Sequence, residues 1–410
     1  MGLRAMNSDP LLTMVVGGIV AAFALGFVAH KLRISPIVGY LLAGVLIGPY
    51  TPGFTADGEL AGELAELGVI LIMFGVGLKF SPAKLIEYRW IALPCALGQI
   101  ALVTALGFGI SALLGMGWIE GMIFGFSLSI ASTVVLLRAL EDRHEAATPA
   151  GHLAVSWLIV QDVAAVFVLV VMSTLAQKGV AEAADGEAIA RIVGLKAAEL
   201  ALFVLIMIVI GRRVLPGLLV FIARAKSREL FSLAVFSIAL GIAYAAHAVF
   251  GAGFALGAFA AGLVLNETAI SHRAAEDLIP LRDAFAVLFF VSVGMLFDPG
   301  ILLTQSWTIL AVLAVIILGN GGAAFLMTSI MRVPPPDRVS LAGGLAQIGE
   351  FSFLICGTAL SLNLMSGDAH GLISAGAVLA IALNPIIREA ARFLARRRTS
   401  AAGADLVDPA

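Results

Sequence analysis

Apolar residues occupy most of this chain in long runs that short polar segments separate. Many runs reach the length of about 20 residues that a helix needs to cross the hydrocarbon core of a bilayer. Two of them, 35–49 and 281–297, are short for a full crossing. We predict an all-α polytopic membrane protein with about 13 transmembrane helices. The predicted spans are roughly 11–31, 35–49, 59–78, 88–114, 117–137, 149–174, 193–221, 229–249, 251–267, 281–297, 303–331, 338–360 and 369–394.

Composition supports this class, because the 410 residues are 60% hydrophobic and 13% charged, with a mean hydropathy of +1.05. A soluble domain cannot bury so many apolar runs in one core. The bilayer is therefore the expected partner, and no nucleic-acid partner is expected. The chain has no Walker A sequence and no His-Glu-x-x-His motif, so an ATP-driven pump or a zinc hydrolase is not predicted. Residues Gly251, Gly253 and Gly257 resemble a dinucleotide loop only superficially, because they lie in an apolar run.

Basic residues are distributed unequally between the two sets of loops. With 13 spans, one face carries only Arg4, Lys178, Arg191 and Lys196, and the other carries the remaining 21 of the 25 Lys and Arg residues. Cytoplasmic loops are enriched in Lys and Arg. We therefore expect residues 1–10 to lie outside and the tail 396–410 to lie in the cytoplasm of a bacterial-type inner membrane.

Two sequence segments recur at a nearly constant distance. Gly77, in Leu71–Pro82, matches Gly294, in Leu288–Pro299, at an offset of 217, and the segment 39–44 matches 257–262 at an offset of 218. This offset spans seven predicted helices, an odd number, so the second copy enters the membrane upside down. We predict inverted repeats at 11–174 and 229–395, joined by a linker helix at 193–221.

Span five and its repeat partner, span twelve, carry polar and glycine residues at mid-membrane depth. Span five has Ser129, Ser132 and Thr133, and span twelve has Gln347 and Glu350. Ser, Thr and Gly weaken helices, and an unwound segment exposes backbone groups that need a polar or ionic partner. These patterns indicate two broken helices around a cation site. The alternative for span five is a helix-packing face of small residues.

Asp162 is a single carboxylate inside the apolar run 153–172. A charge at membrane depth costs about 3 kcal/mol on insertion scales, so such residues usually face a wet cavity and have a function there. Its neighbour Gln161 offers a carbonyl oxygen without charge. The alternatives are an inert buried Asp162 and a helix–helix hydrogen bond for Gln161.

The segments Ser129–Thr133, Gln161–Asp162, Phe289–Met295 and Gln347–Phe353 together resemble the monovalent cation:proton antiporter-2 family, most closely its Kef-type potassium-efflux branch. The resemblance covers about residues 11–395. It implies a fold like the sodium/proton antiporters, in which a core with two crossed, broken helices moves against a dimerising domain in an elevator-like step. It also implies a homodimer and a monovalent cation, K+ or Na+, bound at Asp162 in exchange for H+, with no cofactor.

The chain departs from this family in two places. Many relatives carry a Lys in span eleven, where the polar position here is the neutral Asn320. Its amide is the candidate group for holding the crossed helices. Kef-like proteins usually continue into a cytoplasmic nucleotide-binding regulatory domain, which residues 396–410 do not form. The chain is either a natural short form or part of a longer protein.

These residues predict a secondary transporter in which proton and cation compete for Asp162. Electrogenic relatives have two adjacent acids where this chain has Gln161 and Asp162, so we expect one proton per cation and an electroneutral cycle. Gln161, Ser129, Ser132 and Thr133 are expected to help bind the ion, with Asn320 and Gln347 in support. Glu350 either lines the ion path or neutralises half-helix N-termini, and Glu63 and Glu66 either line an entrance or form a solvated helix start. K+ is favoured over Na+ as the cation, and the alternatives are a gated monovalent cation channel, a Na+/H+ antiporter and, with less support, a membrane enzyme.

Overall fold

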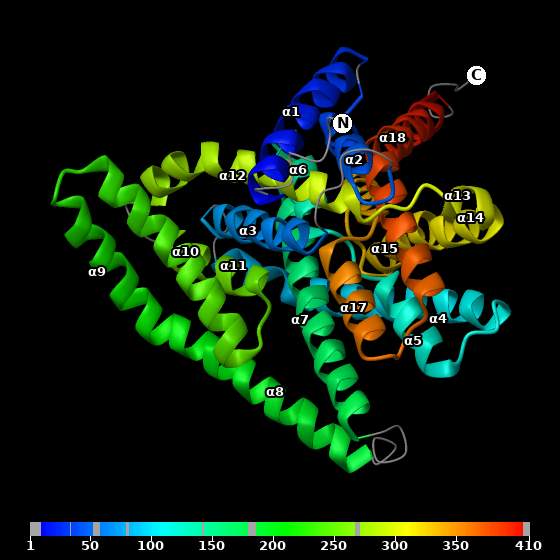
Figure 1. Cartoon of the computed structure of the whole chain (residues 1–410), viewed down its shortest axis with the longest axis horizontal. Helices are drawn as coiled ribbons and strands as arrows, with labels where there is room; N and C mark the ends of the chain where they lie inside the picture. The colour runs from blue at the N-terminus through cyan, green and yellow to red at the C-terminus, as the bar shows by residue number, and fades with distance from the viewer. Residues whose placement is uncertain are drawn as a thin grey trace, which may run out of the picture. The chain divides into compact units, whose positions relative to one another are not determined.

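Every element in the described part of the computed structural model is helical, as the apolar runs predict (Figure 1). The structure describes residues 10–32, 34–51, 58–78, 82–141, 143–178, 186–266 and 271–404. The predictions for the N-terminal residues 1–9 and for residues 405–410 lie outside these ranges. The predicted tail begins inside a helix, because the last helix continues to Ala404.

The helices follow one another along the chain with short connections. The first group is α1 (Pro10–Lys31), α2 (Pro36–Ile47), α3 (Gly58–Gly77), α4 (Pro82–Leu113), α5 (Trp118–Ser127), α6 (Thr133–Glu141) and α7 (Pro149–Lys178). Next come α8 (Gly186–Ile206), the π-helical turn η1 (Met207–Gly211) and α9 (Arg212–Ala223). The last group is α10 (Arg228–Phe250), α11 (Phe254–Asn266), α12 (Ser271–Met295), α13 (Ile301–Thr304), α14 (Ser306–Ala314), the π-helical turn η2 (Val315–Gly319), α15 (Asn320–Ile330), α16 (Pro335–Leu345), α17 (Glu350–Ser361) and α18 (Gly367–Ala404).

The number of spans agrees with the prediction. Among the described residues, nine helical stretches are long and apolar enough to cross a membrane, and three shorter apolar helices lie at Pro36–Ile47, Glu66–Gly77 and Phe254–Asn266. The pair α5 and α6 completes the thirteen predicted positions. Large apolar side chains are exposed on these helices, with Phe23 at 74% and Leu318 at 72%, as expected for a surface that faces lipid.

The helices recur at the offset that the sequence matches indicated. α5 and α16 begin at Trp118 and Pro335, and α6 and α17 begin at Thr133 and Glu350, so both pairs lie 217 residues apart. α7 and α18 begin at Pro149 and Gly367, at an offset of 218. The connecting α8, η1 and α9 lie between the two sets.

The chain divides into two compact units that cut across the repeats. The first unit is residues 1–84 and 166–300, and the second is 85–165 and 301–410. Each unit therefore takes helices from both copies, and α7 belongs in part to each. In the first unit, α10 packs along α8 and α9, as Figure 1 shows in green.

Glycines at matching positions of the repeats bring helices of the first unit into close contact. A methyl group on Gly44 of α2 would lie 2.8 Å from Gly294 Cα of α12. At the equivalent crossing, a methyl group on Gly262 of α11 would lie 3.0 Å from Gly77 Cα of α3. These four glycines are the ones that the sequence offsets align, so the matched glycines mark two equivalent helix crossings.

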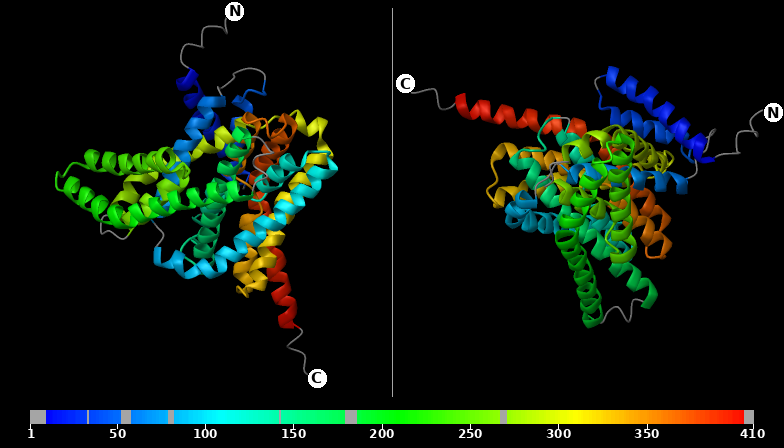
Figure 2. Two further views of the ribbon diagram at one scale, coloured as in Figure 1. Left: turned by 90° about the horizontal axis from the view of Figure 1, so that it is seen from below. Right: turned by 90° about the vertical axis from the view of Figure 1, so that its left-hand side faces the viewer.

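The second unit holds both broken helices, and α15 and α18 pack against them. α4 and the first part of α7 contact the break between α5 and α6 through Gln99 and Gln161, and α14 packs on α18. α18 is 38 residues long and is the red rod in Figure 2. Its start and the start of α7 are capped alike: the Ser366 hydroxyl accepts the Ala369 N–H at 3.3 Å, and the Thr148 hydroxyl accepts the Gly151 N–H at 3.2 Å.

Candidate ion-binding site

Two helices of the second unit are interrupted in their middles. α5 ends at Ser127 and α6 begins at Thr133, whereas α16 ends at Leu345 and α17 begins at Glu350. The four half-helix ends carry backbone N–H and C=O groups without intrahelical partners, and inside a membrane these groups need other partners. The interruptions lie at the Ser-rich and Gly-rich segments that the sequence singled out.

The two interruptions satisfy part of this need by contacting each other. The Gly349 N–H donates to the Ile130 carbonyl at 3.3 Å, and the Ser352 hydroxyl donates to the Ser127 carbonyl at 2.6 Å. A side chain on Gly349 would lie 2.8 Å from the Ser132 hydroxyl, so glycine is required for this approach. The breaks therefore cross at the depth where both helices are unwound.

Gln347 joins the crossing by pairing with the backbone of Ser132. Its Oε1 accepts the Ser132 N–H at 3.1 Å, and its Nε2 donates to the Ser132 carbonyl at 3.1 Å. One carboxamide thus serves both backbone groups of Ser132, whose N–H precedes α6 and whose carbonyl also accepts the Leu136 N–H at 3.2 Å. Gln347 and Ser132 are both fully buried, so water cannot replace these two hydrogen bonds.

A second set of amides holds the break between α5 and α6 from the other side. The Asn320 Nδ2 donates to the Leu128 carbonyl at 2.8 Å, and the Gln99 Nε2 donates to the Ser129 carbonyl at 2.8 Å. The Gln161 Oε1 accepts the Ala131 N–H at 3.1 Å. Gln161 also donates to the Gln99 Oε1. Asn320 lies directly after η2, a π-helical turn of the kind that often occurs at functional positions.

Asp162 lies beside the start of α6. It is 1% exposed, and its Oδ1 accepts a long hydrogen bond of 3.4 Å from the Thr133 hydroxyl. The Glu350 carboxyl lies nearby, because it contacts Ser132, the residue before Thr133. An ionised carboxylate in such a place is costly unless a cation or a proton compensates its charge.

Glu350 lies in the first turn of α17 and reaches the start of α6. Its Oε2 accepts the Ser132 hydroxyl at 3.1 Å, and the same hydroxyl accepts the Val135 N–H at 3.2 Å as the N-cap of α6. Negative charge near helix N-termini is stabilising. Within the described structure, Oε1 of Glu350 is buried and has no hydrogen-bond partner.

The eight residues that the sequence predicts to bind or support the ion all lie in the second unit, around this crossing. The contacts join Asp162 to Thr133, Gln161 to Ala131, Ser132 to Glu350 and Gln347, and Asn320 to Leu128. The Ser129 hydroxyl, by contrast, donates to the Phe126 carbonyl of its own chain segment at 2.7 Å. Glu63 and Glu66 lie on α3 in the first unit, where both are exposed.

Sequence reasoning missed Gln99 and Trp157. Gln99 is fully buried on α4 and contacts Ser129, Asn320, Gln161 and Trp157. The sequence feature that could have identified Gln99 is its position as a single amide in the apolar run 91–107. Trp157, one turn before Gln161, donates to the Gln99 Oε1 at 3.4 Å.

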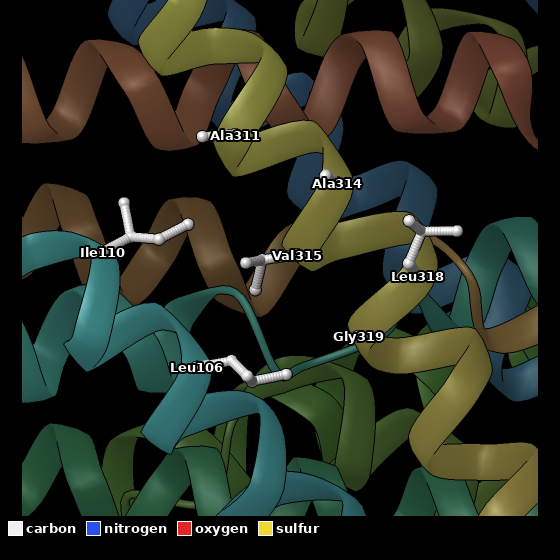
Figure 3. Close-up of a pocket in the computed structure, with 7 residues that line it drawn as sticks. All are labelled: Leu106, Ile110, Ala311, Ala314, Val315, Leu318 and Gly319. Atoms are coloured by element: carbon white, nitrogen blue, oxygen red, sulfur yellow. The ribbon is translucent and has the colours of Figure 1, made fainter.

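An apolar groove of about 410 Å³ lies next to η2 (Figure 3). Leu106 and Ile110 of α4 line one side, and Val315, Leu318 and Gly319 of η2 line the other. These residues offer no ligand for a cation. The polar groups of this part of the unit are instead gathered at the crossing.

The crossing therefore presents the buried Asp162 carboxylate of α7, the Glu350 carboxylate at the start of α17, and hydroxyl and backbone oxygens of the two interruptions. The family pattern described as "Sodium/hydrogen exchanger, transmembrane" matches residues 18–389. This chain belongs to that family. The exchanger is accordingly a multi-pass membrane transporter, and its activity is cation/proton antiport.

Relatives agree with this assignment. The exchanger is 51% identical over 383 residues to the "Putative cation/proton antiporter YbaL" of Escherichia coli (strain K12). The aligned region covers 93% of this chain and 68% of the relative. It is 49% identical over 274 residues to the "Uncharacterized protein in phaC 3'region" of Methylorubrum extorquens, over 65% of this chain and 99% of the relative.

A solved structure confirms the predicted fold class. The sodium proton antiporter MjNhaP1 from Methanocaldococcus jannaschii at pH 8 superposes with a TM-score of 0.67 at 17% identity, over 93% of this exchanger and 99% of that chain. An electron-microscopy structure of the same protein gives a TM-score of 0.57 at 17% identity, over 97% and 98% of the two chains. At this identity the likeness concerns the fold.

Proposed function

We propose that this exchanger trades one monovalent cation, K+ in preference to Na+, for one proton by competition at Asp162. The observation that carries the proposal is the burial of this carboxylate at 1% exposure beside two crossed, unwound helices. Burial disfavours the charged form of a carboxyl, and an adjacent cation favours it. A proton and a cation therefore displace each other at the two Asp162 carboxylate oxygens. Coupled exchange follows if the ionised site, with neither ion bound, moves poorly between the two sides of the membrane.

The surroundings of Asp162 support an electroneutral cycle. Its neighbour Gln161 is an uncharged amide that hydrogen-bonds the Ala131 N–H and Gln99. The second carboxyl, Glu350, lies in the first turn of α17 and accepts the N-cap hydroxyl of α6, and these contacts suit a fixed structural charge. One exchanging carboxyl then carries either one proton or one monovalent cation.

The division into compact units supports an elevator-like step. Both breaks, the amides and Asp162 lie within the second unit, so this unit can carry the ion site as a whole. The preference for K+ rests on the likeness of Gln161–Asp162 and Gln347–Phe353 to the Kef-type branch. The excess of basic residues on one set of loops supports an orientation with the N-terminus outside and the C-terminus in the cytoplasm.

The decisive experiment is Asp162→Asn in reconstituted vesicles that contain a pH-sensitive dye. We expect this variant to release no protons when K+ is added. Asp368→Asn, on the exposed first turn of α18, is the matched control and should exchange at the native rate. Undiminished exchange in a folded Asp162→Asn variant would refute the proposal.

Two further measurements test the electroneutral stoichiometry and the preference for K+. An imposed membrane potential should leave the exchange rate unchanged if one proton moves per cation, and rates with K+, Na+, Rb+ and Li+ in parallel test the cation preference. A gated channel, the alternative, would carry the cation without moving protons in the same dye assay.

A further inference from the structure

Gln99 occupies the centre of the buried amide set, and its carboxamide has a defined orientation. The Trp157 Nε1–H can only donate, so it faces the Gln99 Oε1, at 3.4 Å. The Ser129 carbonyl can only accept, so it faces the Gln99 Nε2, at 2.8 Å. Two neighbours of unambiguous chemistry thus fix which end of this side chain is the donor.

The same logic extends to both neighbouring amides. Asn320 donates through Nδ2 to the Leu128 and Ile316 carbonyls, at 2.8 and 3.0 Å, so its Oδ1 is left to accept the Gln99 Nε2, at 2.5 Å. At the other end, Gln161 donates through Nε2 to Gln99 and turns its Oε1 to the Ala131 N–H. Asn320, Gln99 and Gln161 form one directional amide chain across α15, α4 and α7.

The amide chain occupies the Leu128 and Ser129 carbonyls, and contacts from Gly349, Ser352 and Gln347 occupy others, which determines which oxygens of the break remain available. The carbonyls of Ser127, Leu128, Ser129, Ile130 and Ser132 each accept a hydrogen bond from another part of the second unit. Among the described residues of the break, the Ala131 carbonyl accepts none in this structure. It lies two residues before Thr133, whose hydroxyl binds Asp162.

We propose that Gln99 is a positioning residue for cation binding, and this rests on the proposed function of Asp162. Through Gln161 and Asn320 it holds the break so that the Ala131 carbonyl is left to serve as a backbone ligand beside Asp162. Gln161 then acts by holding the Ala131 N–H, and its own oxygen does not ligate the cation.

The test is a double-mutant cycle on the KM for K+ in reconstituted vesicles, with Gln99→Met, Gln161→Met and the double variant. Each single change removes hydrogen bonds that hold the break, and we expect KM to rise about tenfold. Because both residues act through one chain, the double variant should exceed the stronger single variant by less than about threefold. The maximal rate per folded protein should change less than KM.

The matched control is Thr328→Val on α15. This buried hydroxyl hydrogen-bonds only within its own helix, to the Ala324 and Phe325 carbonyls, so its removal should leave KM unchanged. If Gln99→Met does not fold, Gln99→Glu replaces it in the cycle, since it keeps the acceptor for Trp157 and loses the donor to Ser129.

An unchanged KM in the Gln99 variant, or a double variant whose KM rises about 100-fold as the product of two independent tenfold effects, would overturn the inference. If either result is found while Asp162→Asn releases no protons, the proposed function of Asp162 is still supported. Exchange that persists in Asp162→Asn would instead remove the proposed function itself.

Discussion

The Gln347 side chain offers a quantitative test of the crossing between the two broken helices. Gln347→Met keeps the length of the side chain and removes both hydrogen bonds to the Ser132 backbone, each 3.1 Å long. The Ser132 carbonyl retains the Leu136 N–H at 3.2 Å, but the Ser132 N–H loses its partner.

The expected loss of stability follows from these two bonds. An orphaned buried N–H costs about 1–3 kcal/mol, and a lost bond to a carbonyl that keeps another partner costs about 1 kcal/mol. The sum is roughly 2–4 kcal/mol. For a cooperative unit of about 150–250 residues, each kcal/mol lowers Tm by about 2–4 °C, so we expect Tm to fall by roughly 4–16 °C.

Tryptophan fluorescence is the appropriate assay, because it reports on one unit alone. All four tryptophans, Trp90, Trp118, Trp157 and Trp307, lie in the second unit. The purified protein would be heated in detergent and its emission followed. The matched control is Gln305→Met, whose side chain makes no capping bond at the start of α14 and which should shift Tm by less than about 1 °C.

A Gln347→Met variant that unfolds within about 1 °C of the native protein would refute the reasoning, because the pairing with Ser132 would then contribute nothing net. A Gln305→Met variant that falls by the same amount as Gln347→Met would also refute it. In that case the substitution itself, and not the crossing, would be responsible.

Two other variants test packing and surface electrostatics. Gly44→Ala should destabilise the first unit by about 1–3 kcal/mol, because the new methyl group meets Gly294 at 2.8 Å, whereas Gly241→Ala on α10 meets nothing within 4 Å and should be neutral or stabilising. Far-ultraviolet circular dichroism is the measurement, and equal Tm shifts for the two variants would contradict the close α2–α12 contact. Glu145→Gln weakens the contact of the Arg392 guanidinium with both Glu145 oxygens, at 2.6 and 2.9 Å, and should cost about 0.5–1 kcal/mol. That difference should shrink at high salt, and a loss that is insensitive to salt would argue against an ionic contribution.

Hydropathy and the recurrence of glycines were sufficient to predict the spans, the repeat offset and both helix interruptions. These features are written locally: an apolar run must cross the bilayer, and a segment such as Ser127–Thr133 has residues that compete with helical hydrogen bonds. Gly44 and Gly77 could be aligned with Gly262 and Gly294 because close helix approach requires small residues in both copies.

Gln99 could not be predicted in the same way. Its partners Gln161 and Asn320 lie 62 and 221 residues away in the chain, and no local pattern shows that three amides on different helices meet. The sequence also did not predict the two compact units, because each unit combines helices from both repeats. A sequence repeat gives the order of equivalent helices along the chain, whereas the compact units depend on which helices pack together in three dimensions.

The neutral Asn320 changes how the charge of the site is held. A lysine at this position would add a basic group to the contacts with Leu128 and Gln99, and its protonation could then change during the cycle. Asn320 instead binds the Leu128 carbonyl and Gln99, so the scaffold around the break is uncharged at every contact that the amide chain makes. This chain of amides contains no basic group, and among the described residues at the crossing the carboxyl groups are those of Asp162 and Glu350, which contact the neighbouring residues Thr133 and Ser132. If Glu350 is committed to the half-helix N-termini, Asp162 is the group whose charge must be compensated in turn by H+ and by the cation. The proposed exchange of one proton for one cation then follows from the arrangement of neutral amides as much as from the carboxylate itself.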